Sequence, residues 1–422
     1  MQVALVFRKP PQHPVPMLTQ KKDLRGGTPL WADSPGSTVR TRTATRHEHC
    51  DVAIIGGGVS GALTALTLSE LGLDCVVIDR RKPGSGSTAA STAMIQFELD
   101  TPLIELSKKI GARRANRAYR RSLQGVKNLK RLIQKHDIDC DWVDRDALYL
   151  AGNEMGFRGL KIEAKKRKAA GLPSDYIDAA ALRDTFGIDR TGALLSQGAG
   201  ELNPALLTAG ALRAAQAKGC RVYSDSTVTA VKADGDRVEL ITETDARFTA
   251  KRVIFATGYE TVAGVPKGLF DITSSWAIAT QPLPDEAFWP TRCLIWEAAD
   301  PYLYLRATAD NRILAGGEDS GLTDPARRDA AIAVKSAKLL KSLNTLLPGR
   351  TLRIDYAWAG AFATSPTGLP IITALDELPN CFAILGCGGN GITFSMVAAE
   401  IAAAWAQDKR DADSDLFERA GK

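Results

Sequence analysis

The chain of 422 residues has few of the groups that usually bind metal ions or form disulfide frameworks. It contains four histidines and seven cysteines, and no two cysteines form a Cys-x-x-Cys pair. His47-Glu48-His49 places two histidines on one face of an extended segment, but no third ligand lies near it in the sequence. We therefore expect no metal site, and we expect the cysteines to be reduced thiols in a cytoplasmic protein.

Long apolar runs are also missing. No stretch approaches the roughly 20 apolar residues that span a bilayer, and the five-residue run at 3–7 is soon followed by prolines. We expect neither a signal peptide nor an integral membrane segment. Residues 1–49 are predicted to be a loosely held basic extension. Met17 is an alternative start, which would leave residues 1–16 outside the mature chain.

Beyond its first residues the chain has no excess of either charge. The net charge of +6 comes from 54 Lys and Arg against 48 Asp and Glu. Residues 1–46 hold eight bases and two acids, which is the whole excess, so residues 47–422 carry 46 of each. A protein that binds nucleic acid over its whole surface is therefore not expected. With 45% hydrophobic residues the chain has enough apolar material for two domains.

A dinucleotide-binding pattern begins at residue 50. The β-branched run Cys50–Ile55 predicts a strand, and Gly56-Gly57-Gly58-Val59-Ser60-Gly61 follows it, before apolar residues at helical spacing. A second apolar run, 75–78, ends at Asp79. The order strand, Gly-x-Gly-x-x-Gly, helix, strand and acid indicates a dinucleotide site much more strongly than a glycine triplet alone.

Each part of this pattern has a physical task. Gly56 permits a tight turn, Gly58 lets a pyrophosphate approach the backbone, and Gly61 lets the helix pack on the strand. The helix N-terminus offers free N–H groups to the phosphates. Asp79 can accept hydrogen bonds from ribose hydroxyls, and its charge would repel the 2′-phosphate of NADP.

Three further segments are rich in small residues. Gly84–Met94 is a loop whose hydroxyls could hold a pyrophosphate or simply cap a helix. Arg252–Gly258 is a predicted buried strand that ends in Ala-Thr-Gly. Gly386–Thr393 repeats the Gly-x-Gly-x-x-Gly spacing before a helix, but a charged tail at 408–422 follows that helix instead of a strand. We therefore expect this helix to face the same cofactor.

These motifs resemble those of the D-amino-acid oxidase-like family of FAD-dependent amine and amino-acid oxidoreductases, which includes glycine and sarcosine oxidases. The resemblance covers most of residues 50–407. It implies an α/β fold in which a discontinuous, Rossmann-like FAD-binding domain carries an inserted mixed-sheet substrate domain. The FAD-binding domain would comprise residues 50–98, 195–265 and 345–407, and the substrate domain 99–194 and 266–344.

The resemblance also implies the chemistry and the cofactor contacts. A C–H bond next to nitrogen would give a hydride to flavin N5, and the imine would hydrolyse in water. Electrons would then pass to oxygen or to a quinone or other carrier. The FAD is expected to be non-covalent and to contact Gly56, Gly58, Val59, Ser60, Gly61, Asp79, Arg80, Ser87, Thr88, Ser91, Val228, Ala256, Thr257, Gly258, Gly389, Asn390, Gly391, Ile392 and Thr393.

Two substrate anchors of the family are missing from this chain. Glycine-oxidase-like relatives carry Trp-Ala-Gly-x-Arg-Pro, whose arginine binds the substrate carboxylate, whereas Phe362 stands at that position here. Sarcosine-oxidase-like relatives carry a lysine in the final loop, where this chain has Thr393. A phenyl ring cannot replace a bidentate guanidinium. We assign no catalytic residue.

Two predicted strand faces supply other substrate-pocket candidates. Tyr302, Tyr304 and Arg306 alternate onto one face, which either lines a pocket or covers the sheet with Arg306 paired to Glu318 or Asp319.

The second face consists of Gln96, Glu98 and Asp100, just after the Ser/Thr loop. Relatives carry this stretch near the flavin, and a carboxylate there would suit a cationic amine. Glu98 is the expected carboxylate.

The last feature is a basic stretch. Eleven Lys and Arg and no acid lie from Lys108 to Lys135, with apolar residues at helical spacing, and a second cluster spans 165–168. A solvated helix face explains it most simply. An anionic membrane surface or RNA would explain it too, so an FAD-dependent tRNA-modifying enzyme is an alternative function, although nucleic acid is not the expected partner. A flavin-binding protein without catalysis is a third.

Overall fold

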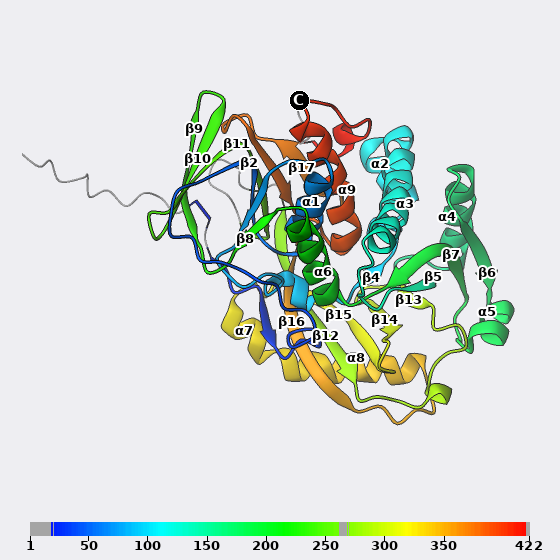
Figure 1. Cartoon of the computed structure of the whole chain (residues 1–422). Coiled ribbons are helices and arrows are strands. Elements are labelled where there is room, and N and C mark those ends of the chain that lie inside the picture. Colours follow the sequence, from blue (N-terminus) through cyan, green and yellow to red (C-terminus); the bar gives the residue numbers. More distant parts are fainter. Residues whose placement is uncertain (1–17, 20, 261–267, 269, 419–422) are drawn as a thin grey trace, which may run out of the picture.

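Two β-sheets organise the chain, and both are built from segments far apart in the sequence (Figure 1). The computed structural model describes residues 18–19, 21–260, 268 and 270–418. The alternative start at Met17, the first part of the predicted extension and residues 261–265 of the predicted FAD-binding domain lie outside the described residues.

The first sheet contains the predicted dinucleotide pattern. Among the described residues it has eight strands, with β17-β18-β11-β2-β3-β8 as its path and the β9–β10 hairpin beside β11. The neighbours from β18 to β8 are parallel, and the side chains of β3 are wholly buried, as expected for a sheet covered on both faces. The strands are β2 (Glu48–Ile55), β3 (Cys75–Ile78), β8 (Arg221–Tyr223), β9 (Val228–Asp234), β10 (Arg237–Thr242), β11 (Arg247–Gly258), β17 (Ile371–Ala374) and β18 (Cys381–Leu385).

Three helices, α1 (Val59–Glu70), α6 (Pro204–Ala217) and α9 (Gly391–Ala406), pack together in the layer next to this sheet. α1 and α9 are apolar on most sides because each is enclosed by neighbours. Asn203 caps α6 by accepting the N–H groups of Ala205 and Leu206, ahead of Pro204 in the first turn.

The second sheet is mixed. Its ten strands among the described residues follow the path β1-β16-β12-β15-β14-β13-β5-β7-β4, with β6 beside β7, and only β13–β5 is a parallel pair. The strands are β1 (Arg25–Gly27), β4 (Met94–Ile95), β5 (Val143–Leu150), β6 (Ser174–Asp178), β7 (Gly192–Glu201), β12 (Asp271–Thr280), β13 (Leu294–Glu297), β14 (Leu303–Ala307), β15 (Ile313–Ser320) and β16 (Ile354–Thr364). The other elements are α2 (Leu103–Ile110), α3 (Ala112–Lys135), α4 (Phe157–Ala169), α5 (Ala179–Phe186), α7 (Pro325–Ala330), α8 (Ile332–Leu346) and the short helices η1 (Ser87–Ala90), η2 (Asp285–Ala287) and η3 (Ser414–Leu416).

The mixed sheet differs from the expected domain boundaries in three strands. β4 pairs with β7, although residues 50–98 were expected in the FAD-binding domain. β16 pairs with β12 along most of its length, so it lies in the second sheet, although residues 345–407 were expected in the FAD-binding domain. β7 likewise crosses the expected boundary at 195 and pairs with β5. Strand pairing between distant segments is not visible in a linear motif, which explains the difference.

The described part of the N-terminal extension is not loose. β1 adds to the edge of the mixed sheet beside β16, and Arg42 forms a bridge to Tyr223 of the first sheet. Trp31 is buried and donates its indole N–H to the backbone oxygen of Ser91 at 2.8 Å. The extension therefore lies across both sheets, in contrast to the expectation from its composition.

The basic stretch forms α2 and α3, and its inner face is buried as the spacing predicts. On the outer face, Arg117 pairs with Asp413 and Asp415 at 2.9 and 2.6 Å, and Arg121 pairs with Asp411 at 3.0 Å. The predicted charged tail thus docks on the basic helix, where Phe417 is buried. Much of the positive charge on the outer face of these helices, which could have bound RNA, is therefore neutralised by acidic residues of the same chain.

The second basic cluster contains a buried cation. Arg167 is completely buried and contacts Glu163 at 2.8 Å and Glu98 at 3.6 Å. The Glu163 carboxylate also accepts the backbone N–H groups of Leu103 and Ile104, at the start of α2. Arg167 therefore belongs to the core and is not part of a basic surface.

We predict that Arg167→Ala lowers the free energy of unfolding by about 3–5 kcal/mol, because it leaves two carboxylates buried without their cation. Urea denaturation followed by circular dichroism measures this change. Lys168→Ala is the matched control, because the side chain of Lys168, the next residue, is 77% exposed. Its effect on the free energy of unfolding should stay within about 0.5 kcal/mol. Equal effects of the two variants would contradict the assignment.

Candidate functional site

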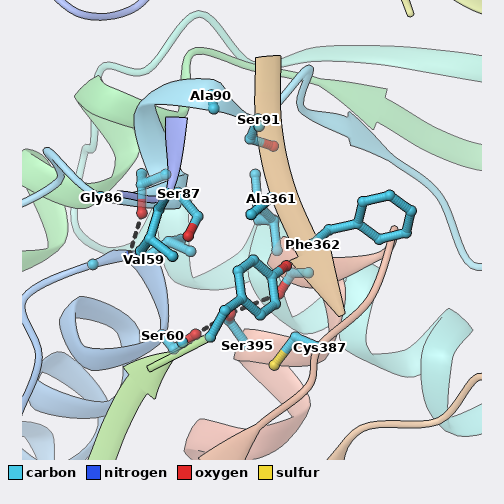
Figure 2. A pocket seen from close by; sticks show the side chains of 18 of the residues that line it. Val59, Ser60, Gly86, Ser87, Ala90, Ser91, Ala361, Phe362, Cys387 and Ser395 are labelled. Atoms are coloured by element: carbon cyan, nitrogen blue, oxygen red, sulfur yellow. Dashed lines mark hydrogen bonds between the residues drawn. The ribbon is translucent and has the colours of Figure 1, made fainter. Parts of the chain in front are cut away.

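One cavity is lined by residues of both sheets (Figure 2). Ile55, Ile78 and Ala256, from β2, β3 and β11, line it on the side of the first sheet. Trp296 and Tyr304, from β13 and β14, line it on the side of the mixed sheet. The sequence motifs and the aromatic strand face therefore meet at one place.

The glycine turn after β2 is tightly packed. Gly56 has φ +113°, and an added Cβ on Gly61 would lie 1.8 Å from the Gly56 backbone oxygen. The Asp79 carboxylate accepts the N–H of Gly57 at 2.6 Å and the N–H of Arg81 at 2.7 Å. Burial raises the pKa of Asp79, while these two N–H groups favour its charged form. Asp79 thus braces the turn and also lines the cavity.

The Ser/Thr loop lies beside this turn. Thr88 in η1 accepts the backbone N–H of Val59 at 3.1 Å, so it contacts the first turn of α1. The hydroxyls of Ser60 and Ser395 are 2.7 Å apart and join the N-terminal ends of α1 and α9 (Figure 2). The glycine turn, the Ser/Thr loop and the start of α9, which were predicted to face one cofactor, are therefore neighbours.

The fit to FAD can be judged from the two helix N-termini. Within the described part of the chain, the N-cap residues of α1 and α9, Gly58 and Asn390, make no side-chain capping hydrogen bond, although Thr88 accepts the N–H of Val59 at the start of α1. Both residues line the cavity, so the N-terminal ends of two helices face it. One N-terminus suits a pyrophosphate and the other suits the polar edge of a flavin ring. The residues present fit FAD.

Most predicted cofactor residues line the cavity. Gly61 is an exception, because it packs under the glycine turn. Thr393 is the other: it is 1% exposed and donates its hydroxyl to the backbone oxygen of Gln96 at 3.1 Å. The lining contains Gly56, Gly58, Val59, Ser60, Asp79, Arg80, Ser87, Thr88, Ser91, Val228, Ala256, Thr257, Gly258, Gly389, Asn390, Gly391 and Ile392.

The substrate candidates divide into two groups. Gln96, Tyr302, Tyr304 and Phe362 line the cavity. Glu98 does not, since its carboxylate is completely buried beside Arg167 and burial raises its pKa. The assignment of Glu98 as a pocket residue is therefore wrong.

Arg306 also lies outside the cavity lining, which corrects its assignment as a pocket residue. It is 2% exposed and donates to the backbone oxygens of Thr92 and Leu202 at 2.6 and 2.9 Å. Its guanidinium stacks on Trp31, and burial lowers its pKa to about 10. The pairing with Glu318 or Asp319 that the sequence allowed is not formed among the described residues. The long Arg306 side chain therefore extends beyond the face that it shares with Tyr302 and Tyr304 and ends at these backbone carbonyl groups.

Several lining residues were missed by the sequence analysis. Glu260 pairs with Arg81 at 2.6 Å and with Arg80 at 3.6 Å, and it accepts the N–H of Lys22 at 2.9 Å. Thr19 accepts a hydrogen bond from Arg80 and lines the cavity. No motif marks these positions, because the contact depends on where the N-terminal extension folds.

Two other expectations concern cysteine and metal. Cys387 lines the cavity next to Ser60, and burial raises the pKa of its thiol to about 12, which keeps it protonated at neutral pH. Among the described residues, no three His, Cys, Asp or Glu side chains are grouped as metal ligands. In the same part of the chain, no helix has the length and apolar character needed to cross a membrane.

We predict that Gly61→Ala weakens FAD binding by about tenfold or more, because the new methyl group displaces the turn that approaches the pyrophosphate. Fluorescence titration of the apoprotein with FAD measures the dissociation constant. Gly321→Ala is the control, since nothing lies within 4 Å of its added Cβ. Unchanged FAD affinity in a folded Gly61→Ala protein would refute the role of this contact.

Comparison with known proteins gives concordant results. A family model described as FAD dependent oxidoreductase (DAO) matches residues 51–405. Gamma-glutamylputrescine oxidoreductase of Escherichia coli is 28% identical over 84% of this chain and 83% of its own length, and glycine oxidase of Geobacillus kaustophilus is 24% identical over 86% and 94%. The structure of that glycine oxidase covers 89% of this chain and 99% of its own, with a TM-score of 0.74 and 21% identity. L-Proline dehydrogenase from P. horikoshii gives a TM-score of 0.75 at 19% identity, covering 88% and 97%. The predicted two-domain α/β flavoprotein fold is confirmed, and the chain belongs to the DAO family of FAD-dependent oxidoreductases.

Proposed function

We propose that this protein uses non-covalent FAD to oxidise the C–H bond next to nitrogen of a small amine or amino acid. The observation that carries the proposal is the shared cavity, because the N-terminal ends of α1 and α9 and the aromatic face of the mixed sheet line the same space. The matching family and its named relatives support the same reaction class.

The residues of the chain divide the work between two ends of the cavity. Gly56, Gly58 and the first turn of α1 suit the pyrophosphate, and Asp79 suits the ribose. Gly389 and the first turn of α9 would lie along the polar edge of the flavin ring, where backbone N–H groups stabilise negative charge. Bound there, FAD supplies the two-electron acceptor for the substrate hydride.

The aromatic side chains have a different role. Trp296, Tyr302, Tyr304 and Phe362 line the cavity and restrict the water that can reach the reacting carbon. Tyr302 and Tyr304 lie with their ring centroids 5.8 Å apart. Such a wall can hold a substrate so that its donor carbon faces the flavin, which is the main requirement of this reaction.

An amine is favoured over an α-amino acid. The residue at the usual arginine position, Phe362, does line the cavity, so a cationic anchor for a carboxylate is lost at that point. One relative is named for an amine substrate, a glutamyl derivative of putrescine. Oxygen and a quinone or carrier both remain candidate electron acceptors. The seven cysteines are all free and six are buried, which supports the expected cytoplasmic location.

The proposal is tested by mixing the purified holoprotein anaerobically with amines, α-amino acids and N-methylated amino acids. We expect loss of the flavin absorbance with at least one amine, and release of intact FAD after acid precipitation. Heat-denatured protein with free FAD is the control for chemical reduction. A flavin that no member of the panel reduces would contradict the proposal and favour a flavin-binding protein without catalysis.

We also predict that Phe362→Arg changes the preference between substrate classes. A guanidinium at this position adds a partner for a carboxylate, so the ratio of kcat/KM for an α-amino acid to that for the matching amine should rise by about tenfold. Phe362→Leu is the control for lost ring volume, and it should not raise this ratio. Equal ratios in the two variants would show that position 362 does not contact the substrate.

A further inference from the structure

Asp100 is a carboxylate that lies in the cavity but takes no part in the dinucleotide motifs. It lines the cavity and its side chain is exposed to it. Its carboxylate accepts a hydrogen bond from the backbone N–H of Gly389 at 3.2 Å. The surrounding protein and the charge of Asp319 raise the pKa of Asp100, so a bound cation would stabilise its ionised form.

The backbone at Gly389 makes room for this carboxylate. A Cβ added to Gly389 would lie 2.7 and 2.8 Å from the two carboxylate oxygens of Asp100. Any other residue would therefore push Asp100 away from the loop that precedes α9. The pair fixes an acid next to the residues proposed to line the flavin ring.

The charges around the cavity are separated by sign. Among the described lining residues the cations are Arg80 and Arg81, and both pair with Glu260 at the dinucleotide end. No lysine, arginine or histidine of the described lining stands beside Asp100 to neutralise it. Asp319 lies behind the cavity wall, where it accepts the hydroxyl of Tyr302 at 2.7 Å and adds negative charge.

Two buried polar groups in the same wall also lack partners. Gln96 is 7% exposed, and its side-chain oxygen has no hydrogen-bond partner in the described part of the chain. Trp296 is 8% exposed, and its indole nitrogen is likewise unpaired there. Both residues line the cavity, and buried polar groups normally have partners. The Gln96 oxygen is an unpaired acceptor in the same cavity as the uncompensated Asp100 carboxylate, and the two together indicate a ligand with N–H donors.

We propose that Asp100 binds the ammonium group of a cationic amine substrate, with the Gln96 oxygen as a second acceptor and the aromatic wall of Trp296, Tyr302 and Tyr304 around it. This assignment rests on the proposed function and narrows its substrate class. Aromatic faces attract cations, so the wall and the acid select the same ligand. A substrate carboxylate would be repelled at this point.

The test uses three probes that share a tert-butyl group and differ in charge: tert-butylammonium, tert-butanol and pivalate. None has a C–H bond next to nitrogen, so none can be oxidised by the proposed reaction. Binding to the FAD-loaded protein is read from the flavin difference spectrum. In the unaltered protein we expect tert-butylammonium to bind at least about tenfold more tightly than pivalate.

Asp100→Asn should weaken tert-butylammonium binding by about 10- to 100-fold and leave tert-butanol binding unchanged. Asp175→Asn is the matched control, since Asp175 is exposed on β6, and it should change neither. If the unaltered protein binds pivalate more tightly than tert-butylammonium, the proposal is overturned, whether or not the Asp100 variant folds. Equal affinity of the unaltered protein and the Asp100→Asn variant for tert-butylammonium would overturn it too.

The two proposals can fail separately. If no amine or amino acid reduces the flavin but tert-butylammonium binds through Asp100, the reaction assignment fails and the cation site stands. If an α-amino acid reduces the flavin and pivalate binds more tightly than the cation, the reaction stands and the cation site is wrong.

Discussion

The arrangement of the whole molecule depends on the close contact at the start of α1. Gly61 packs directly against the backbone of Gly56, and Asp79 holds the turn between them through the N–H of Gly57. Gly58 and Val59 at the start of α1 line the cavity, and the hydrogen bond between Ser60 and Ser395 brings the N-terminal end of α9 beside them. Both sheets then deliver residues to one space.

The two ends of the chain complete this arrangement. On one side, the N-terminal extension adds a strand to the mixed sheet and contributes Thr19 and Leu24 to the cavity lining. On the other, the acidic C-terminal segment neutralises Arg117 and Arg121 of the basic helix. Charge that looks like a nucleic-acid signal in the sequence is thus partly used for packing within the chain.

The fold and the dinucleotide end of the site could be predicted from the sequence because they depend on local patterns. The glycine turn, Asp79 and the helix after Gly391 each follow from a few neighbouring residues. The substrate end of the site could not be predicted in this way. The alternation of residues along a strand shows which side chains share a face, but it does not show how far each side chain extends. Arg306 shares the face of Tyr302 and Tyr304, yet it ends on buried carbonyl groups. On the neighbouring face Glu98 is held by Arg167, and Asp100 reaches the cavity instead.

The most direct test of this account is a crystal structure of the FAD-loaded protein with bound tert-butylammonium. The account predicts the pyrophosphate at the N-terminus of α1 and the flavin ring beside Gly389 and Ile392. It also predicts the ammonium nitrogen about 3 Å from the Asp100 carboxylate. A flavin ring away from the start of α9, or an ammonium group that does not contact Asp100, would contradict it.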